Sequence, residues 1–277
     1  MATWLRWPWL SPFQRPKEQE EDIMIDLTGR VALVTGSSRG IGRACALRLA
    51  EAGADMVVNY ISSHAAAMEV AEQIAALGRR VAVVKADVSE QEDVHAMVEF
   101  VGQQFGKLDI LVSNAATGGF RPLLSANSRH FDRTMHTNVL ALVYLVQAAL
   151  PLLEKSQGRA KVVAISSHGS HMALPWYGLI GGSKAALESV ARHLTLEVGH
   201  RGVNVNVVKA GLVETDSTRR IPQAEAIFAG RTEKTLVGNR VLQAEDVANA
   251  VLFLASPLSD MIQGETLTVD GGAAIHP

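Results

Sequence analysis

Short apolar runs alternate along this chain with longer segments in which apolar and polar positions follow a helical period. Most runs are rich in valine and isoleucine and are flanked by glycine, asparagine or aspartate, which is typical of parallel strands buried on both faces. Seven strands are predicted, over Val31–Thr35, Asp55–Tyr60, Val81–Lys85, Ile110–Ser113, Lys161–Ser166, Val203–Lys209 and Thr266–Val269. This repeated alternation predicts an α/β fold with a doubly wound parallel sheet and helices on both of its faces.

The segments between the runs are long enough for crossover helices, for example His64–Leu77 and Ser89–Phe105. The second opens with Ser89 followed three residues later by Glu92, which predicts a capping box at its first turn. No internal repeat or linker interrupts the pattern. We therefore expect a single domain over residues 25–277.

Residues 1–24 have a different composition. They contain three of the four tryptophans, three prolines that prevent a regular helix, and then a charged run. The segment lacks the continuous apolar stretch and the cleavage site of a secretory signal. We expect a disordered tail, or a start upstream of a true first residue at Met24. The alternative is an aromatic patch that touches a membrane interface or a partner protein.

Composition excludes several classes of function. Hydrophobic residues make up 48% of the 277 residues and charged residues 19%, which is typical of a well-packed soluble protein. A net charge of −2 gives no reason to expect nucleic acid or an anionic membrane as partner. Cys45 is the only cysteine, so we expect no internal disulfide and a reducing, cytoplasmic compartment. The longest apolar run, Val139–Leu153, is too short to span a membrane and predicts a buried or interface helix.

A glycine-rich turn follows the first predicted strand. Gly36, Gly40 and Gly42 lie in TGSSRGIG, between the strand VALVT and an amphipathic helix. Small residues let the backbone approach a pyrophosphate, and the free N–H groups at the helix start favour negative charge. The turn therefore predicts a Rossmann-type dinucleotide site, with a purely structural glycine turn as the alternative.

The order of motifs resembles one family. The glycine spacing, together with SNAA at Ser113–Ala116 and VDGG at Val269–Gly272, resembles the short-chain dehydrogenase/reductases from about Leu27 to Gly272. In that family the positions matching Asp87 and Val88 contact adenine, and those matching Asn114 and Ala115 pass the ribose. The predicted cofactor-binding residues are Gly36, Ser38, Arg39, Gly40, Ile41, Gly42, Tyr60, Ser62, Ser63, Asp87, Val88, Asn114, Ala115, Lys184, Gly211 and Val213.

Charge around the second strand favours NADPH as the cofactor. An acidic residue about 20 positions after the glycines would bind the ribose hydroxyls of NAD and repel a 2′-phosphate, but Tyr60 stands there. Arg39 lies inside the glycine loop, and Ser62 and Ser63 add hydroxyl donors. The alternative is that Arg39 is a solvated surface residue.

The candidate catalytic segment contains Tyr177 seven residues before Lys184, with Ile180 four residues before it. Reductases of the resembled family usually have their tyrosine four before the lysine. Lys184 would hold the nicotinamide ribose and lower the pKa of the tyrosine, which would donate a proton to the developing oxyanion. When a ketone is reduced, hydride acceptor and oxyanion are directly bonded. When a 2-enoyl thioester is reduced, charge collects on the C1 oxygen, farther from the nicotinamide.

The Tyr-x6-Lys spacing resembles the NADPH-dependent type III enoyl-acyl-carrier-protein reductases. The likeness includes TGSSRG, NAA at 114–116, GSKAALE at Gly182–Glu188 and DMIQGETLTVDGG near the C-terminus. It implies an acyl thioester substrate, carried on acyl carrier protein, with Tyr177 as enolate donor and Lys184 as ribose-binding lysine. Two alternatives stay open, a carbonyl reductase of the same family and a non-catalytic nucleotide-binding protein.

Other residues near this segment are candidates for supporting roles. Ser167 matches the serine that holds the substrate oxygen in carbonyl reductases, and Asn138 matches the family asparagine of a water relay or is only a helix-kinking residue. The sequence Lys209-Ala210-Gly211 replaces the usual proline-glycine of the family. The conformation of the backbone beside the nicotinamide therefore does not follow from the resemblance. His168 and His171 are expected to be polar lining or helix-end contacts, and no metal is expected.

The segment Leu212–Gln243 is predicted to be a substrate lid over the carboxyl ends of the strands. Arg219 and Arg220 would contact an acidic carrier protein or simply form a solvated helix face. The resemblance also implies a homodimer or homotetramer, packed through the apolar helix around Val139–Leu153 and the helix after Lys184.

Overall fold

Seven parallel strands form a single sheet in the computed structural model, which describes residues 25–238 and 240–275. The predictions made for residues 1–24 lie outside the described residues. The sheet order is β3-β2-β1-β4-β5-β6-β7. The strands are β1 (Val31–Val34), β2 (Asp55–Tyr60), β3 (Val81–Lys85), β4 (Ile110–Ser113), β5 (Ala160–Ser167), β6 (Val203–Ala210) and β7 (Thr266–Val269). The predicted doubly wound parallel sheet is confirmed.

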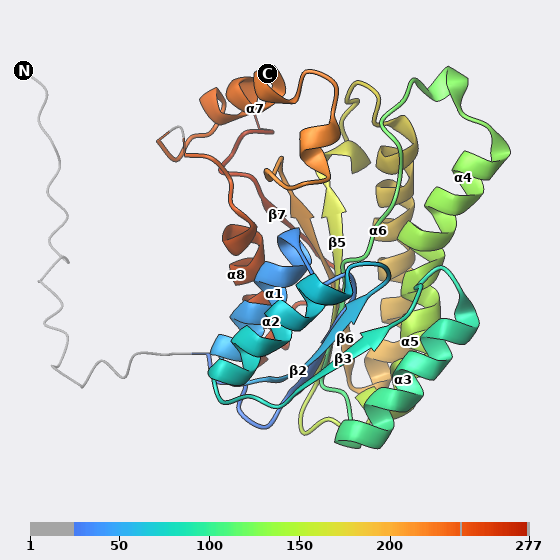
Figure 1. Ribbon diagram of the computed structural model, residues 1–277, viewed down its shortest axis with the longest axis vertical. Coiled ribbons are helices and arrows are strands. Elements are labelled where there is room, and N and C mark those ends of the chain that lie inside the picture. The colour runs from blue at the N-terminus through green and yellow to red at the C-terminus, as the bar shows by residue number, and fades with distance from the viewer. Residues whose placement is uncertain (1–24, 239, 276–277) are drawn as a thin grey trace, which may run out of the picture.

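Helices cover both faces of the sheet (Figure 1). One face carries α1 (Gly40–Glu51), α2 (His64–Ala76) and α8 (Ala244–Ala255), and the other carries α3 (Gln91–Phe105), α5 (Ala141–Leu153) and α6 (Gly178–Val198). Helix α4 (Ser128–Met135) leads through the π-helical turn η2 (His136–Leu140) into α5, and α7 (Ala224–Glu233) lies above the carboxyl ends of the strands. Short 3-10 turns are η1 (Leu123–Ser125), η3 (His168–Ser170), η4 (Gly199–Arg201), η5 (Thr218–Arg220) and η6 (Pro257–Ser259).

The core consists of two apolar clusters, one on each face of the sheet. Successive strand residues alternate between them, so Val34 packs in the first and Leu33 in the second. Both faces are covered, which explains why the central strands are continuously apolar rather than alternating. Cys45 is fully buried in the first cluster, and this burial raises the pKa of its thiol to about 12. Cys45 is therefore a packing residue.

The longest apolar segment of the described chain is a core helix. The helical stretch Ser128–Leu153 is long and apolar enough to cross a membrane by length and composition alone, but half of its most apolar window is buried inside the protein. Within α5, Leu142, Leu145 and Val146 pack in the second cluster. The prediction of a buried helix in this region is confirmed by that packing.

The first turn of α3 differs from its prediction. The helix begins at Gln91 with Glu90 as N-cap, so the capping box expected from Ser89 and Glu92 is wrong. The hydroxyl of Ser89 instead donates to the Asp87 carboxylate at 2.7 Å. A carboxylate two residues away is a close and strong acceptor, and it holds Ser89 in the turn that precedes the helix.

The sheet order reverses between β1 and β4. Chains leaving the carboxyl ends of these neighbouring strands turn to opposite faces, which opens a crevice there. The glycine loop follows β1, and Asn114 and Ala115 follow β4. The fold thus brings two separate sequence motifs to one place.

Candidate active site

The glycine loop between β1 and α1 has a backbone that favours glycine. Gly36 and Gly40 have φ angles of +63° and +57°, in the left-handed region. The N-cap of α1 is Arg39, whose side chain makes no capping hydrogen bond. The first N–H groups of α1 are therefore free of a side-chain cap, as an anion-binding helix start requires.

Asn114 closes the loop from the neighbouring strand. Its Nδ2 donates to the carbonyl of Thr35 at 2.8 Å and to that of Gly36 at 3.3 Å. A Cβ at Gly42 would lie 2.4 Å from this Nδ2 and 2.5 Å from the Gly36 carbonyl oxygen. Only glycine at position 42 permits this close approach. The predicted place of Asn114 beside the cofactor ribose stays a prediction.

Sequence reasoning missed two residues that hold the loop. Asn59, buried on β2, accepts from the Gly36 N–H at 3.0 Å and donates to the Ala86 carbonyl at 3.2 Å. The hydroxyl of Thr35 accepts from the backbone N–H groups of Asn114 and Ala115, both at 3.0 Å. An amide inside the apolar run VVNY was the available signal for Asn59, because a buried polar side chain needs hydrogen-bond partners.

The residues predicted to select the cofactor lie around the outer end of this crevice. Arg39 and Ser62 are exposed, and Tyr60 ends β2 with its ring 5.4 Å from that of His64. Arg39 lies in none of the ion pairs of the described residues. Its guanidinium is thus available to an anionic ligand.

Lys184 lies in the second turn of α6 and is buried. Its Nζ donates to the backbone carbonyl of Ile165 on β5 at 2.6 Å. Burial lowers the pKa of Lys184 to about 8, and the Glu188 carboxylate one helical turn later acts in the opposite direction. Burial thus brings the pKa of Lys184 closer to neutral than that of an exposed lysine.

Tyr177 lies just before α6 rather than within it. It is the N-cap residue of a helix that begins at Gly178, so it extends from the preceding loop. Its hydroxyl lies 3.0 Å from the Ser167 hydroxyl at the end of β5. Burial raises the pKa of Tyr177, and the hydrogen bond with Ser167 only partly offsets this effect. The expected lowering of the Tyr177 pKa is therefore wrong for the unliganded protein, because desolvation of the phenolate is the largest effect and the opposing one comes from Ser167.

Glycines and one strained residue fix the position of the Tyr177 ring. A Cβ at Gly169 would lie 2.4 Å from two atoms of the ring, and Phe120 stacks on it with centroids 6.0 Å apart. Trp176 has a φ of +58°, which is unfavourable for a large side chain, and its carbonyl accepts from the Arg121 N–H at 2.9 Å. The loop around residues 117–123 thus positions the tyrosine from outside its own segment.

Ile180 occupies the first turn of α6, at the position where the family usually has its tyrosine. It is buried, with 8% of its surface exposed. Its side chain fills the space above Gly118, where a Cβ would lie 2.3 Å from Ile180 Cγ1. An aliphatic side chain packed in this way provides no proton donor at the usual position.

Asn138 lies within the π-helical turn between α4 and α5. Its side chain accepts from the Thr117 N–H at 2.8 Å and donates to the Thr117 carbonyl and the Ser183 hydroxyl, both at 2.9 Å. Asn138 thus joins η2, the loop after β4 and α6. Its predicted role in a water relay near Lys184 stays a prediction, while these contacts establish a positioning role.

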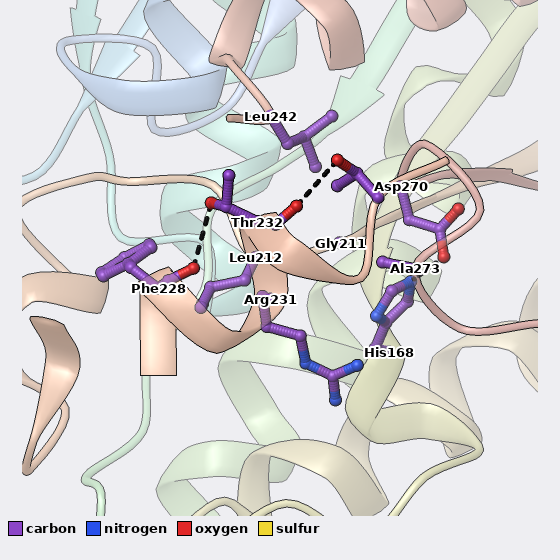
Figure 2. A pocket seen from close by; sticks show the side chains of 10 residues that line it. His168, Gly211, Leu212, Phe228, Arg231, Thr232, Leu242, Asp270 and Ala273 are labelled. Carbon is purple, nitrogen blue, oxygen red and sulfur yellow. Dashed lines mark hydrogen bonds and ion pairs between the residues drawn. The ribbon is translucent and has the colours of Figure 1, made fainter. Parts of the chain in front are cut away.

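A separate cavity of about 20 Å³ lies under α7, with room for about one water molecule. Its lining includes His168 after β5, Gly211 after β6 and Asp270 after β7, and Figure 2 shows Arg231 of α7 pointing toward His168. Tyr177, Ser167 and Lys184 do not line it. A cavity of this size cannot accept a substrate, and the candidate catalytic residues lie outside it.

His168 packs under α7 and is almost fully buried. Its Nε2 lies 3.0 Å from an Asp270 carboxylate oxygen, without the alignment of a hydrogen bond. Burial lowers the pKa of His168, and Asp270 acts in the opposite direction. The rings of His168 and His171 lie edge to face with centroids 5.7 Å apart. Residues 25–238 and 240–275 contain no group of three His, Cys, Asp or Glu side chains arranged to hold a metal ion.

The predicted lid has η5 and α7 as its ordered elements, above the ends of β5, β6 and β7. Arg219 is exposed and pairs with Glu214 at 2.9 Å, and Arg220 is also exposed. Both arginines therefore lie on a solvated face. The sequence did not determine the backbone of the Lys209-Ala210-Gly211 segment. In the structure, the Gly211 N–H donates to the Val269 carbonyl at 2.9 Å, and Val213 is buried.

The arrangement fits a dinucleotide cofactor. The glycine loop leaves space that a Cβ would fill, the start of α1 is uncapped, and the exposed Arg39 stands at the outer end. At the inner end are a buried lysine and a phenol paired with a serine hydroxyl. A switch-point nucleotide crevice that ends in such a group defines a nicotinamide-dependent oxidoreductase.

Comparison with known proteins identifies the family. A family model described as "Enoyl-(Acyl carrier protein) reductase" matches residues 36–274. The chain belongs to this family of short-chain dehydrogenase/reductases.

Known relatives align over most of the chain. It is 36% identical to 1-cyclohexenylcarbonyl-CoA reductase of Streptomyces collinus, over 89% of this chain and 87% of that protein. A short-chain dehydrogenase from Burkholderia cenocepacia, solved in complex with NADP, superimposes with a TM-score of 0.80 at 36% identity, over 89% of this chain and 98% of that one. LugOII, a reductase described as catalysing keto-reduction at C1 in lugdunomycin biosynthesis, gives a TM-score of 0.80 at 34% identity, with the same coverage.

Proposed function

We propose that this reductase uses NADPH to saturate the 2,3 double bond of an enoyl thioester. The observation that carries the proposal is the position of its phenol. Tyr177 precedes α6, and the usual tyrosine position within the helix holds the buried Ile180. The family description and the similarity to 1-cyclohexenylcarbonyl-CoA reductase of Streptomyces collinus support the same reaction. The NADP complex of the Burkholderia cenocepacia relative supports the cofactor, together with Arg39 and Tyr60.

Bound NADPH supplies the hydride in this reaction. The chain has to stabilise the charge that then appears on the thioester oxygen. Tyr177 donates a hydrogen bond to that oxygen, and its raised pKa keeps it protonated and able to donate at neutral pH. Ser167 orients the phenol through their 3.0 Å contact. Lys184 binds the ribose hydroxyls and contributes positive charge.

The distance between the two reacting positions explains why a displaced tyrosine suits this substrate. Hydride is added at C3, whereas negative charge collects on the oxygen attached to C1. Tyr177 extends from the loop before α6 and not from the usual position within the helix, which Ile180 occupies. We therefore expect its phenol to meet an oxygen farther from the hydride acceptor than a ketone oxygen would be. The proton at C2 is added afterwards, from solvent or through a relay.

A carbonyl reductase is the second candidate. The 3.0 Å contact between Ser167 and Tyr177 is also the arrangement that would hold a ketone oxygen between two hydroxyls. The similarity to LugOII, whose described reaction is a keto-reduction, supports this alternative. In that case the loop brings Tyr177 back toward the usual site despite its displacement along the chain.

A paired turnover assay separates the two candidates. NADPH oxidation is measured with crotonyl and acetoacetyl thioesters, each on coenzyme A and on acyl carrier protein, and repeated with NADH. We expect turnover of the crotonyl thioester with NADPH at least about tenfold faster than any other combination. Turnover of the acetoacetyl thioester alone would instead establish the carbonyl reductase.

Ser167→Ala gives a matched control for the same assay. For enoyl reduction Ser167 only orients Tyr177, so we expect Ser167→Ala to lower turnover by about tenfold or less. For ketone reduction Ser167 contacts the substrate oxygen, and its removal should lower turnover by about a hundredfold or more. A hundredfold loss on the crotonyl thioester would contradict the role given to Ser167.

Three further expectations belong to this proposal. The substrate is carried on acyl carrier protein or coenzyme A in fatty-acid or polyketide-type synthesis. The protein forms a homodimer or homotetramer through α5 and α6. It works in a reducing, cytoplasmic compartment, for which the single buried Cys45 is the supporting observation.

A further inference from the structure

A buried polar cluster lies directly behind Lys184. Ser166 on β5 and Lys209 on β6 are register partners, and both approach Glu188 of α6. The Ser166 hydroxyl donates to one oxygen of the Glu188 carboxylate at 2.5 Å, and Lys209 Nζ lies 3.1 Å from the other. The Glu188 and Lys209 side chains are only 12% and 11% exposed. Both oxygens of the carboxylate are therefore engaged inside the protein.

An ion pair at this position needs an explanation. The strand residues that precede it toward α6 are apolar, among them Ala164 and Val207 of the second core cluster. Replacing a buried ion pair by well-packed apolar residues is often neutral or stabilising, because desolvation of the two charges offsets their attraction. Packing alone therefore does not account for Glu188 and Lys209. Their position next to the active site does.

The cluster is coupled to Lys184 through the geometry of the helix. Residues four apart lie on the same helix face, with Cβ atoms about 5–6 Å apart, so Glu188 is the neighbour of Lys184 on α6. No carboxylate of the described residues lies within ion-pairing distance of Lys184, whose Nζ donates to the Ile165 carbonyl. Glu188 is the acidic side chain that favours the ammonium form of Lys184 against the effect of burial.

We propose that Glu188 and Lys209 are positioning residues that set the charge of the active-site Lys184. Glu188 favours the ammonium form. Lys209 binds the same carboxylate at 3.1 Å, neutralises part of its charge and so limits that support. This inference rests on the assignment of Lys184 to the reductase site in the proposed function.

The other elements packed against this part of α6 contribute few charges. The end of β5 contributes the hydroxyls of Ser166 and Ser167, and η2 contributes the neutral Asn138. Before α6 the titratable group is Tyr177, which is hydrogen-bonded to Ser167. After β5, His168 in η3 faces Asp270. Glu188 and Lys209 are thus the buried opposite charges that flank the lysine.

Opposite effects of the two partners test the proposal. The protonation of Lys184 is followed in the unliganded protein by NMR, from the pH dependence of its 13Cε shift in lysine-labelled samples. Lys184→Arg assigns the signal. We expect Glu188→Gln to lower the midpoint by roughly one pH unit or more, and Lys209→Met to raise it by a similar amount. The basic limb of the pH profile of kcat/KM should move in the same directions.

Two variants serve as controls for structural damage. Lys209→Arg keeps the cation and should return the midpoint to that of the unmodified protein. Ser166→Ala removes a neutral donor and should move the midpoint less than either charge change. Movement of the midpoint in the same direction by Glu188→Gln and Lys209→Met, or no movement by either, would overturn the proposal. Because the titration uses no substrate, its outcome is independent of whether the enzyme reduces an enoyl thioester or a ketone.

Discussion

The two ends of the active site are held in place by different kinds of contact. At the nucleotide end, the loop contains glycines with left-handed φ angles. The side chains of Asn59 and Asn114 hydrogen-bond to its backbone over the carboxyl ends of β1, β2 and β4. At the catalytic end, Tyr177 precedes its helix and is positioned by packing against Gly169 and Phe120.

This difference determines which end tolerates change. A backbone cradle for phosphate depends on a few positions where no side chain fits, so its requirements are visible in a short motif. A phenol held by side-chain packing depends on the loops that contact it. Those loops can differ between reductases while the fold and the lysine stay the same. The catalytic end is therefore where we expect substrate choice to be set in this molecule.

Among the variants that test the two ends of the site, Tyr177→Phe should give the largest loss of turnover. Removing the hydroxyl leaves the ring packed on Gly169 but removes the proton donor to the substrate oxygen. We expect kcat to fall by about 10²- to 10⁴-fold, with the NADPH dissociation constant changed less than about threefold. Steady-state turnover and a fluorescence titration with NADPH measure the two quantities.

Tyr144→Phe provides the matched control, because Tyr144 lies on α5 and packs against the second core cluster. Its loss should leave turnover within about twofold. Substantial activity in Tyr177→Phe would show that another group donates the proton. In that case Tyr177 would serve only for packing beside the cofactor site.

The fold was largely predictable because it depends on local pattern. Apolar runs located four strands residue for residue, and the alternation of strands and helices predicted a doubly wound parallel sheet, which the structure has. The glycine loop was predictable for the same reason. Its hydrogen-bonded support from Asn59 was not, because that support joins three strands that are distant in sequence.

The catalytic end was less predictable from the sequence. The spacing of Tyr177 and Lys184 left open whether the tyrosine lies inside the helix or before it, and the structure places it before. The raised pKa of Tyr177 was missed because burial depends on loops elsewhere in the chain. Lys209 was visible only as a departure from a family motif. Its pairing with Glu188 required the register of β5 and β6.

Gly42→Ala should disrupt the nucleotide end while sparing the catalytic end. Its new Cβ would lie 2.4 Å from Asn114 Nδ2 and 2.5 Å from the Gly36 carbonyl oxygen, so the loop has to shift. We expect NADPH binding to weaken by about thirtyfold or more and stability to fall by about 1–3 kcal/mol. Titration with NADPH and thermal unfolding measure these changes.

Gly182→Ala is the matched glycine change, since it lies within α6 and a Cβ there meets nothing within 4 Å. That substitution should stabilise the protein by about 0.5–1 kcal/mol and leave NADPH binding unchanged. Equal NADPH affinity in Gly42→Ala and in the unmodified protein would show that the crevice between β1 and β4 does not bind the pyrophosphate.

Arg39→Ala should have the smallest effect on the folded protein and sharpen the view of the nucleotide end, because it changes cofactor recognition without changing the loop. Arg39 is exposed, lies in no ion pair of the described chain and caps no N–H group, so its loss should leave stability within about 0.5 kcal/mol. A guanidinium bound to a 2′-phosphate contributes about 1.5–3 kcal/mol, so NADPH should bind about 10- to 100-fold more weakly while NADH affinity stays the same. Arg43→Ala, on the same helix and hydrogen-bonded to Gln73, serves as the control and should affect neither cofactor. Parallel weakening of both cofactors in Arg39→Ala would mean that Arg39 contacts the pyrophosphate, and preference for NADPH would then have to come from the segment after β2.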